Sequence, residues 1–88
     1  MFYTYILHSL KDNKNYIGST SNLKKRFQEH SKGKVFATKG RLPINLIFYE
    51  AFLEQKDAIR REKYFKTNPG KRTLKLMLRS YCSKSQKL

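Results

Sequence analysis

The sequence has very little cysteine and no long run of apolar residues. Its single cysteine, Cys82, excludes an intramolecular disulfide, and without a cluster of cysteines and histidines a structural zinc site is not expected. One cysteine is typical of a reducing compartment, so we expect a cytoplasmic protein. The apolar stretch 1–10 lacks a basic segment and a small-residue cleavage site, which favours a strand over a signal peptide. We expect no membrane association.

Acidic residues are also scarce. Six residues are Asp or Glu and 20 are Lys or Arg, so the formal net charge is +14 at pH 7. Such an excess destabilises a folded chain by self-repulsion, and a polyanionic partner is its usual reason. We therefore expect a nucleic acid as the partner, ahead of a membrane surface, because no lysine-rich amphipathic segment opens the chain.

Aromatic residues, in contrast, are plentiful. Six Tyr and six Phe contribute to a hydrophobic fraction of 39%, which is enough for a compact core. A chain of 88 residues is too short to divide into two domains that each have a core. We expect one domain over residues 1–82, followed by a polar, frayed tail over residues 83–88.

Three segments have the composition of strands. Residues 2–9 are rich in aromatic and β-branched side chains, and a polar turn over 10–15 leads to a second short strand over 16–18. Gly18 is predicted to end that strand, where a side chain would block a turn or a close approach to substrate. Residues 44–52 are apolar on both faces, which predicts a third strand covered by helices on each side.

The first predicted helix follows the hairpin. Ser21 or Asn22 can cap it, and it is expected to run to about His30. Projected at about 100° per residue, Arg26 and His30 lie one turn apart at the edge of its buried stripe. Residues 31–43 are predicted to form a basic loop with one helical turn over 35–38.

Two more helices are expected after the third strand. The first covers 54–66, and Glu62 projects into the middle of its apolar stripe. The second has Asn68 as its N-cap and Pro69 at its first position. Its apolar stripe comprises Leu74, Met77, Leu78 and Tyr81.

A small set of side chains has the chemistry that phosphodiester cleavage requires. Arg26 can hold phosphate oxygens with two donors, His30 can orient a group or move a proton, and Tyr5 or Tyr16 can act as a base if its pKa is lowered. Glu62 can bind a metal ion. Each has a structural alternative: the tyrosines as sheet residues, the arginine as a solvated charge, the histidine as a helix C-terminal contact and the glutamate as a salt bridge.

The order and spacing of these residues resemble the GIY-YIG nuclease family, in particular its small standalone, YhbQ-like members. The second half of the family motif is intact as YIG at 16–18, whereas the first half keeps only its tyrosine in YTY at 3–5. Arg26 and His30 follow at the family's spacing, and Glu62 matches its acidic position on a later helix. The resemblance runs from about residue 2 to residue 75.

The resemblance implies an α+β fold with a three-stranded antiparallel sheet flanked by helices. It also implies a metal-dependent DNA endonuclease that uses one divalent ion, Mg²⁺ or Mn²⁺. Branched, nicked or otherwise distorted DNA is our own candidate for its substrate. Glu62 would bind the metal, Arg26 would hold the scissile phosphate, Tyr5 or Tyr16 would activate the water, and His30 would support the tyrosine or the nucleophile. Either tyrosine could be the base.

The sequence departs from the family pattern at two positions. Tyr3 replaces the glycine of the first motif half, and Ser19 stands where some relatives have a lysine, a cation that Lys39 could supply.

Two rival functions also fit the sequence. One is a non-catalytic nucleic-acid-binding module, and the other is an accessory subunit that needs a partner to cut. We expect a monomer or a weak homodimer. The predicted DNA-contacting cations are Lys24, Lys25, Lys34, Lys39, Arg41, Lys71 and Arg72.

Overall fold

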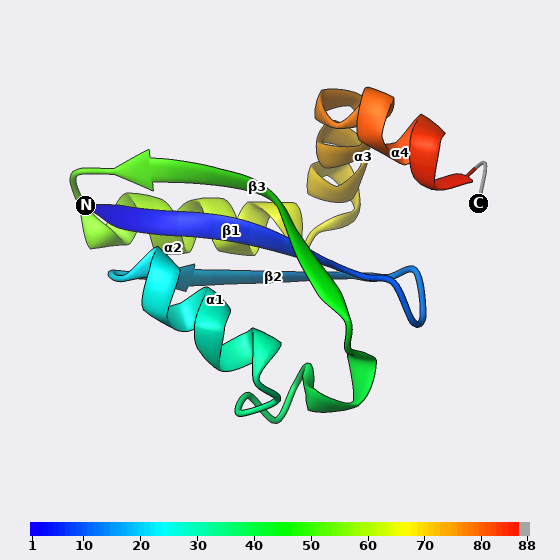
Figure 1. Cartoon of the computed structure of the whole chain (residues 1–88). Coiled ribbons are helices and arrows are strands. Elements are labelled where there is room, and N and C mark those ends of the chain that lie inside the picture. The colour runs from blue at the N-terminus through cyan, green and yellow to red at the C-terminus, as the bar shows by residue number, and fades with distance from the viewer. Residues whose placement is uncertain (87–88) are drawn as a thin grey trace.

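The N-terminal segment of aromatic and β-branched residues forms the middle strand of the sheet. In the computed structural model, which describes residues 1–86, β1 (Phe2–Ser9) pairs antiparallel with β2 (Asn15–Thr20) and with β3 (Ile44–Phe52). The strand order is β2-β1-β3, and helices lie on both faces of the sheet (Figure 1). The predicted α+β fold with a three-stranded antiparallel sheet is confirmed.

The two faces of the sheet carry separate parts of the core. Tyr5 and Leu7 pack with Ile44 on one face, while Ile6 packs with Phe65 on the other. β1 is therefore the strand buried on both faces. The prediction that the segment 44–52 is covered on each side is wrong, because β3 is an edge strand on which Tyr49 is 54% exposed.

The second strand is longer than the sequence indicated. β2 continues through Gly18 to Thr20, and Gly18 lies opposite Tyr5 in the ladder with β1. The prediction that Gly18 ends the strand is wrong because backbone pairing to β1 extends as far as Tyr3 and Thr20.

One helix covers the face of the sheet that carries Tyr5. It is α1 (Leu23–Ser31), and its N-cap is Asn22, whose Oδ1 accepts a hydrogen bond from the backbone N–H of Lys25 at 3.1 Å. The loop that follows contains the expected turn, since the N–H of Thr38 donates to the carbonyl of Val35 at 3.1 Å. A short 3₁₀ helix, η1 (Lys39–Arg41), then leads to β3.

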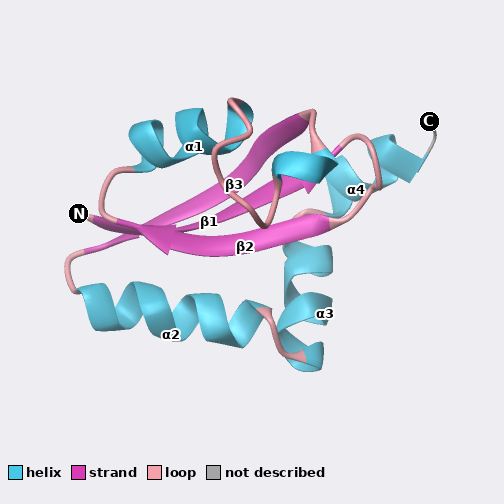
Figure 2. Cartoon of the chain, turned by 90° about the horizontal axis from the view of Figure 1, so that it is seen from below, coloured by secondary structure: helices cyan, strands magenta, loops and turns pink. Residues whose placement is uncertain are grey.

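The opposite face is covered by the C-terminal helices (Figure 2). They are α2 (Gln55–Phe65), α3 (Asn68–Met77) and α4 (Arg79–Gln86). The single helix expected after Pro69 is in fact two, α3 and α4, which are separated at Leu78. Met77, expected in its apolar stripe, is 41% exposed.

Two smaller expectations about the C-terminal part also need correction. Thr67 caps α3 in place of Asn68, since its hydroxyl accepts a hydrogen bond from the N–H of Gly70 at 3.1 Å. Residues 83–86 belong to α4 and do not form a frayed tail, and residues 87–88 lie outside the described part of the chain. Within residues 1–86, no helix is long and apolar enough to cross a membrane.

Candidate active site

Both motif tyrosines lie on the face of the sheet that α1 covers. Tyr5 on β1 is opposite Gly18 on β2, and its ring centroid is 6.3 Å from that of Tyr16. A Cβ atom at position 18 would lie 2.5 Å from the hydroxyl of Tyr5 and 3.1 Å from the ring of Tyr16. Gly18 therefore leaves the space that the Tyr5 hydroxyl occupies.

His30 connects α1 to this tyrosine pair. Its side chain is fully buried, Nε2 lies 2.9 Å from the Tyr5 hydroxyl, and Nδ1 lies 2.7 Å from the hydroxyl of Thr38. The His30 ring is also 5.0 Å from that of Tyr16, centroid to centroid. Burial, and then the positive charge of Arg26, lower the pKa of His30 to about 4, so the imidazole is neutral at pH 7.

Arg26 approaches the same hydroxyl from one helical turn earlier. Burial raises the pKa of Tyr5 to about 12, although the nearby guanidinium of Arg26 acts in the opposite direction. Tyr5 therefore keeps its proton at pH 7, and its hydroxyl is joined through the neutral imidazole of His30 to the hydroxyl of Thr38. These three side chains form one chain of hydrogen bonds, and the half-buried guanidinium of Arg26 lies near its first member.

Glu62 reaches the same edge of the sheet from the other face. Its Oε1 accepts a hydrogen bond from the hydroxyl of Ser19 at 2.7 Å, and its Oε2 accepts one from Lys66 at 2.8 Å. Ser19 follows Gly18 directly on β2, and the charge of Glu62 is one of the groups that raise the pKa of Tyr5. Glu62 therefore forms the ion pair that was its structural alternative, and it also lies at the candidate site.

The structure brings the predicted site residues to one edge of the sheet. Tyr5, Tyr16 and His30 contact one another on the α1 face with Arg26 near them, and Glu62 is joined to β2 through Ser19. Figure 2 shows α1 and α2 on opposite faces, so both faces contribute to the site. The catalytic roles of these residues remain predictions at this point.

Two residues of the site were missed by sequence reasoning. Ser19 was considered only as a replacement for a lysine, yet its hydroxyl orients the Glu62 carboxylate. Because side chains alternate along a strand, Ser19 could have been placed on the face of β2 opposite to that of Gly18. Thr38 binds His30 from a loop eight positions later, and no periodic pattern indicates that contact.

The predicted DNA-contacting cations fall into two groups. Lys24, Lys25, Lys34 and Lys39 are exposed on α1 and the loop after it, whereas Lys71 and Arg72 are exposed on α3 and belong to the opposite face (Figure 2).

The seventh predicted cation, Arg41, is paired with an acidic side chain of the protein itself. The guanidinium of Arg41 is bonded to Asp12 at 2.8 Å, and its backbone carbonyl accepts a hydrogen bond from Ser9. The loop also displays Phe36, which is 84% exposed, with the ammonium group of Lys39 placed 4.9 Å from its ring centroid.

The protein's own ligands for a metal ion are few. Within the described part of the chain, no group of three or more His, Cys, Asp or Glu side chains could hold one. Glu62, at 20% side-chain exposure, is the carboxylate of the site. Mg²⁺ in phosphoryl-transfer sites is commonly held by one or two carboxylates together with substrate phosphates and water, so this donor set fits such an ion.

Comparison with known proteins agrees with this geometry. Residues 1–75 match the GIY-YIG catalytic domain. The chain is 40% identical over 78 residues to a UPF0213 protein of Clostridium perfringens, covering 88% of this chain and 83% of the relative. It is 46% identical over 57 residues to the UPF0213 protein YazA of Bacillus subtilis, covering 64% and 58%.

A solved structure has the same fold. The solution NMR structure of a UPF0213 protein from Bacillus halodurans superposes with a TM-score of 0.55 at 33% identity, and the match covers 88% of this chain and 85% of that protein. The resemblance drawn from the motif residues is confirmed. This chain belongs to the GIY-YIG family of nucleases.

Proposed function

We propose that this protein is an endonuclease that hydrolyses phosphodiester bonds of DNA, including branched, nicked or distorted DNA, with one Mg²⁺ or Mn²⁺ ion. The observation that supports the proposal is that an arginine, a tyrosine–histidine pair and a carboxylate lie at one edge of the sheet. These groups come from β1, β2, α1 and α2, so only the folded chain brings them together.

Glu62 would hold the metal ion. Ser19 and Lys66 each donate a hydrogen bond to one of its carboxylate oxygens, which fixes the orientation of the group. A bound divalent ion would supply Lewis-acid stabilisation of the charge that develops on the phosphoryl oxygens. The Lys66 side chain is 55% exposed, so its ammonium group can move into solvent when a cation takes its place.

Arg26 would hold the scissile phosphate. Its guanidinium donates to the Glu29 carboxylate at 3.2 Å and lies near enough to the Tyr5 hydroxyl for its positive charge to affect the pKa of that group. Its side chain is 37% exposed, so it is open to an incoming phosphate. A guanidinium presents several donors in a fixed plane and can bind two phosphate oxygens at once.

The two tyrosines differ in a way that suggests different roles. Tyr5 is only 1% exposed, and its hydroxyl is hydrogen-bonded to His30 and lies near the guanidinium of Arg26. We assign it a positioning role, in which it links Arg26 to His30. Tyr16 is half-buried beside the same imidazole and is the tyrosine that reacting water can reach. Neutral His30 contacts both tyrosines and would hold their rings in position.

Cleavage assays with matched variants test the proposal. The purified protein is incubated with plasmid and with single-stranded, nicked and branched DNA in Mg²⁺, Mn²⁺ or EDTA. We expect metal-dependent cutting that falls by at least about 100-fold in Glu62→Gln and Arg26→Ala, the scale seen when one transition-state contact is removed. Thermal unfolding of each variant verifies that it is folded.

The chain offers a control for each substitution. Glu54→Gln removes an exposed acid from the start of the same helix as Glu62. Arg60→Ala removes an arginine that pairs with Asp57 at the same three-residue spacing as Arg26 and Glu29. Both controls should cut like the wild type. Absence of metal-dependent cutting on every substrate would overturn the proposal and leave a nucleic-acid-binding module or an accessory subunit.

A further inference from the structure

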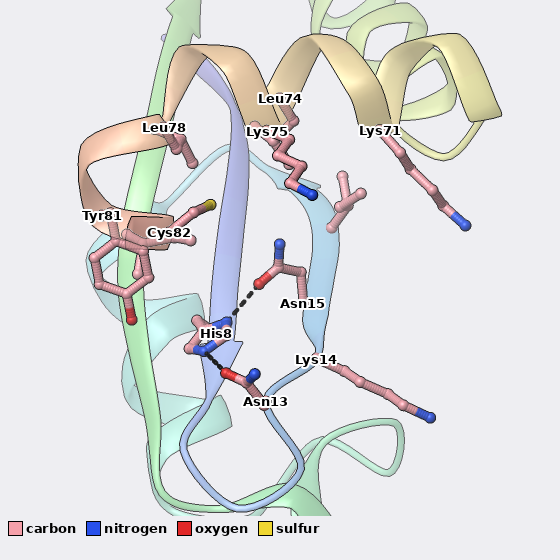
Figure 3. Close-up of a pocket in the computed structure, with 12 residues that line it drawn as sticks. His8, Asn13, Lys14, Asn15, Lys71, Leu74, Lys75, Leu78, Tyr81 and Cys82 are labelled. Atoms are coloured by element: carbon pink, nitrogen blue, oxygen red, sulfur yellow. Dashed lines mark hydrogen bonds between the residues drawn. The ribbon is translucent and has the colours of Figure 1, made fainter. Parts of the chain in front are cut away.

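A second pocket lies away from the candidate active site, on the face of the sheet that carries the C-terminal helices. It opens between the β1–β2 hairpin and the helices α3 and α4 (Figure 3). Its volume is about 470 Å³, which is within the range of about 300–1,000 Å³ for small-molecule sites. None of the predicted catalytic side chains lines it.

The lining of this hairpin pocket is partly apolar and partly aromatic. Ile17, Ile47 and Leu74 contribute apolar side chains, and Tyr81 of α4 contributes an aromatic ring. The Tyr81 ring meets the His8 ring edge-on, with centroids 5.5 Å apart and planes at 84°. A flat, partly apolar ligand therefore has both a surface to cover and an aromatic neighbour.

His8 orients the amides at the base of the pocket. Its Nδ1 is 2.7 Å from Oδ1 of Asn15, and its Nε2 is 2.8 Å from Oδ1 of Asn13. A neutral imidazole has one donor and one acceptor nitrogen, so His8 donates to one of these amides and accepts from the other. The Asn15 side chain extends from the base toward the centre of the pocket (Figure 3).

The mouth of the pocket is positively charged. Lys71 and Lys75 extend from α3, and Lys14 extends from the hairpin on the open side (Figure 3). Within residues 1–86, no carboxylate pairs with these three ammonium groups, and none is among the lining residues. Charges left unpaired around a partly apolar pocket suit a ligand with an anionic group next to a planar body.

The hairpin pocket is connected to the candidate active site by one strand. Asn15, Ile17 and Ser19 alternate along β2 and share one face, and Ser19 holds the Glu62 carboxylate. At about 3.4 Å per residue, Ile17 is about 7 Å and Asn15 about 14 Å from Ser19 along the strand. A nucleic-acid strand that places a phosphate near Glu62 would reach the pocket within a few nucleotides.

We propose that the hairpin pocket binds one unpaired nucleotide of the strand that the active site cuts. The base would lie against the apolar lining beside Tyr81 and form a hydrogen bond with the Asn15 amide, while its phosphate would contact Lys71 and Lys75. A base can enter only when it is not paired, so the pocket selects strands with an unpaired nucleotide near the cleavage point. This assignment rests on the proposed nuclease function for the identity of the strand.

Nucleotide binding can be measured without cleavage. The ¹⁵N-labelled protein is titrated in EDTA with deoxyadenosine 5′-monophosphate and, separately, with deoxyadenosine and with inorganic phosphate, and amide shifts are followed by NMR. We expect saturable shifts clustered at Asn15, Lys75 and Tyr81 with the nucleotide, and weaker binding of either half alone. Glu62→Gln should bind the nucleotide like the wild type.

Variants locate the site and separate it from the nuclease activity. Lys75→Ala should weaken nucleotide binding several-fold, whereas Lys56→Ala, which removes an equally exposed charge from α2, should not. Tyr81→Leu should weaken binding of the nucleotide and of the nucleoside but not of phosphate.

The outcomes are distinguishable. Shifts with phosphate equal to those with the nucleotide, or shifts spread over all lysines, would overturn the pocket assignment even if the protein cuts DNA. Nucleotide binding in the pocket of a protein that cuts no DNA would instead leave the pocket in place and reject the nuclease function.

Discussion

Gly18 determines, at the scale of single residues, whether the hydrogen-bonded chain from Tyr5 through His30 to Thr38 can form. In Gly18→Ala the new methyl group would overlap the hydroxyl and ring of Tyr5, which is fully buried and cannot move aside freely. We expect a loss of about 1–3 kcal/mol in the free energy of unfolding, as for other overpacked cores. Urea unfolding measures this loss.

Gly40 supplies the control for that substitution. A Cβ atom at Gly40 meets no atom within 4 Å, so Gly40→Ala should change stability by less than about 0.5 kcal/mol. If Gly18→Ala were as stable as Gly40→Ala, the position of the Tyr5 hydroxyl described above would be wrong.

His30 is expected to make stability depend on pH between about 6.5 and 4. Its pKa is lowered to about 4 in the folded protein, so over this range the unfolded chain binds more protons and the fold loses stability as the pH falls. The shift corresponds to about 3 kcal/mol at most. Chemical denaturation at a series of pH values should show this slope in the wild type and a flatter one in His30→Gln.

The other histidine provides the comparison for this experiment. His8→Gln leaves the His30 site intact and should keep the difference between pH 6.5 and pH 4.5 that His30 causes. Equal slopes in the wild type and in His30→Gln would mean that His30 is not neutral and buried as described.

The residue scale also shows which parts of the site could be predicted. Arg26 and His30 were found because helical periodicity places them one turn apart, and Glu62 because it interrupts an apolar stripe. The contacts of Ser19 and Thr38 depend on strand pairing and loop conformation, which no local pattern encodes. The separate roles proposed for the tyrosines likewise rest on burial, which only the folded chain defines.

At the scale of elements, the junction between α2 and α3 depends on Gly70. This glycine is buried at the start of α3, and a Cβ atom there would overlap the backbone carbonyl of Tyr64 on α2. Backbone atoms move aside less readily than the end of a side chain. Gly70→Ala should therefore lower the free energy of unfolding by at least about 3 kcal/mol, the upper end of the range for overpacked cores. Thermal unfolding beside Gly40→Ala measures it.

Gly70→Ala should also affect the hairpin pocket and the Tyr5–His30 contact to different extents. Because α3 contributes a wall of the hairpin pocket and α2 carries Glu62, separation of these helices should weaken nucleotide binding before it affects the contacts of Tyr5 and His30. A variant with wild-type stability would show that α2 and α3 do not pack closely.

Element boundaries were predicted well where one local signal dominates. The Asn22 cap, and the extents of α1 and α2, follow from capping and periodicity. The sequence misassigned the strand buried on both faces, since apolar composition in 44–52 says nothing about which strand is central. It also missed the break at Leu78, because the apolar stripe continues across it to Tyr81.

The excess of positive charge acts on the molecule as a whole. The net charge of +14 is distributed over both faces of the sheet, and the exposed lysines of α1 and its loop are on the side that carries Arg26. Affinity for DNA should therefore fall steeply with salt, by about 10³–10⁵ between 50 and 200 mM if about 6–10 phosphates are contacted. Fluorescence anisotropy in EDTA measures binding without cutting.

Single-lysine variants determine whether this binding uses a defined face. If Lys25 contacts a phosphate, Lys25→Ala should reduce the slope of log affinity against log salt by about 0.9 on duplex DNA, the contribution of one contact. Lys56→Ala removes the same charge from an exposed position at the start of α2 and should leave the slope unchanged. Equal reductions in both variants would indicate attraction by net charge alone, with no strand directed across Arg26 toward Glu62. A reduction confined to Lys25→Ala would define the face on which DNA enters, because α1 and α2 cover opposite faces of the sheet.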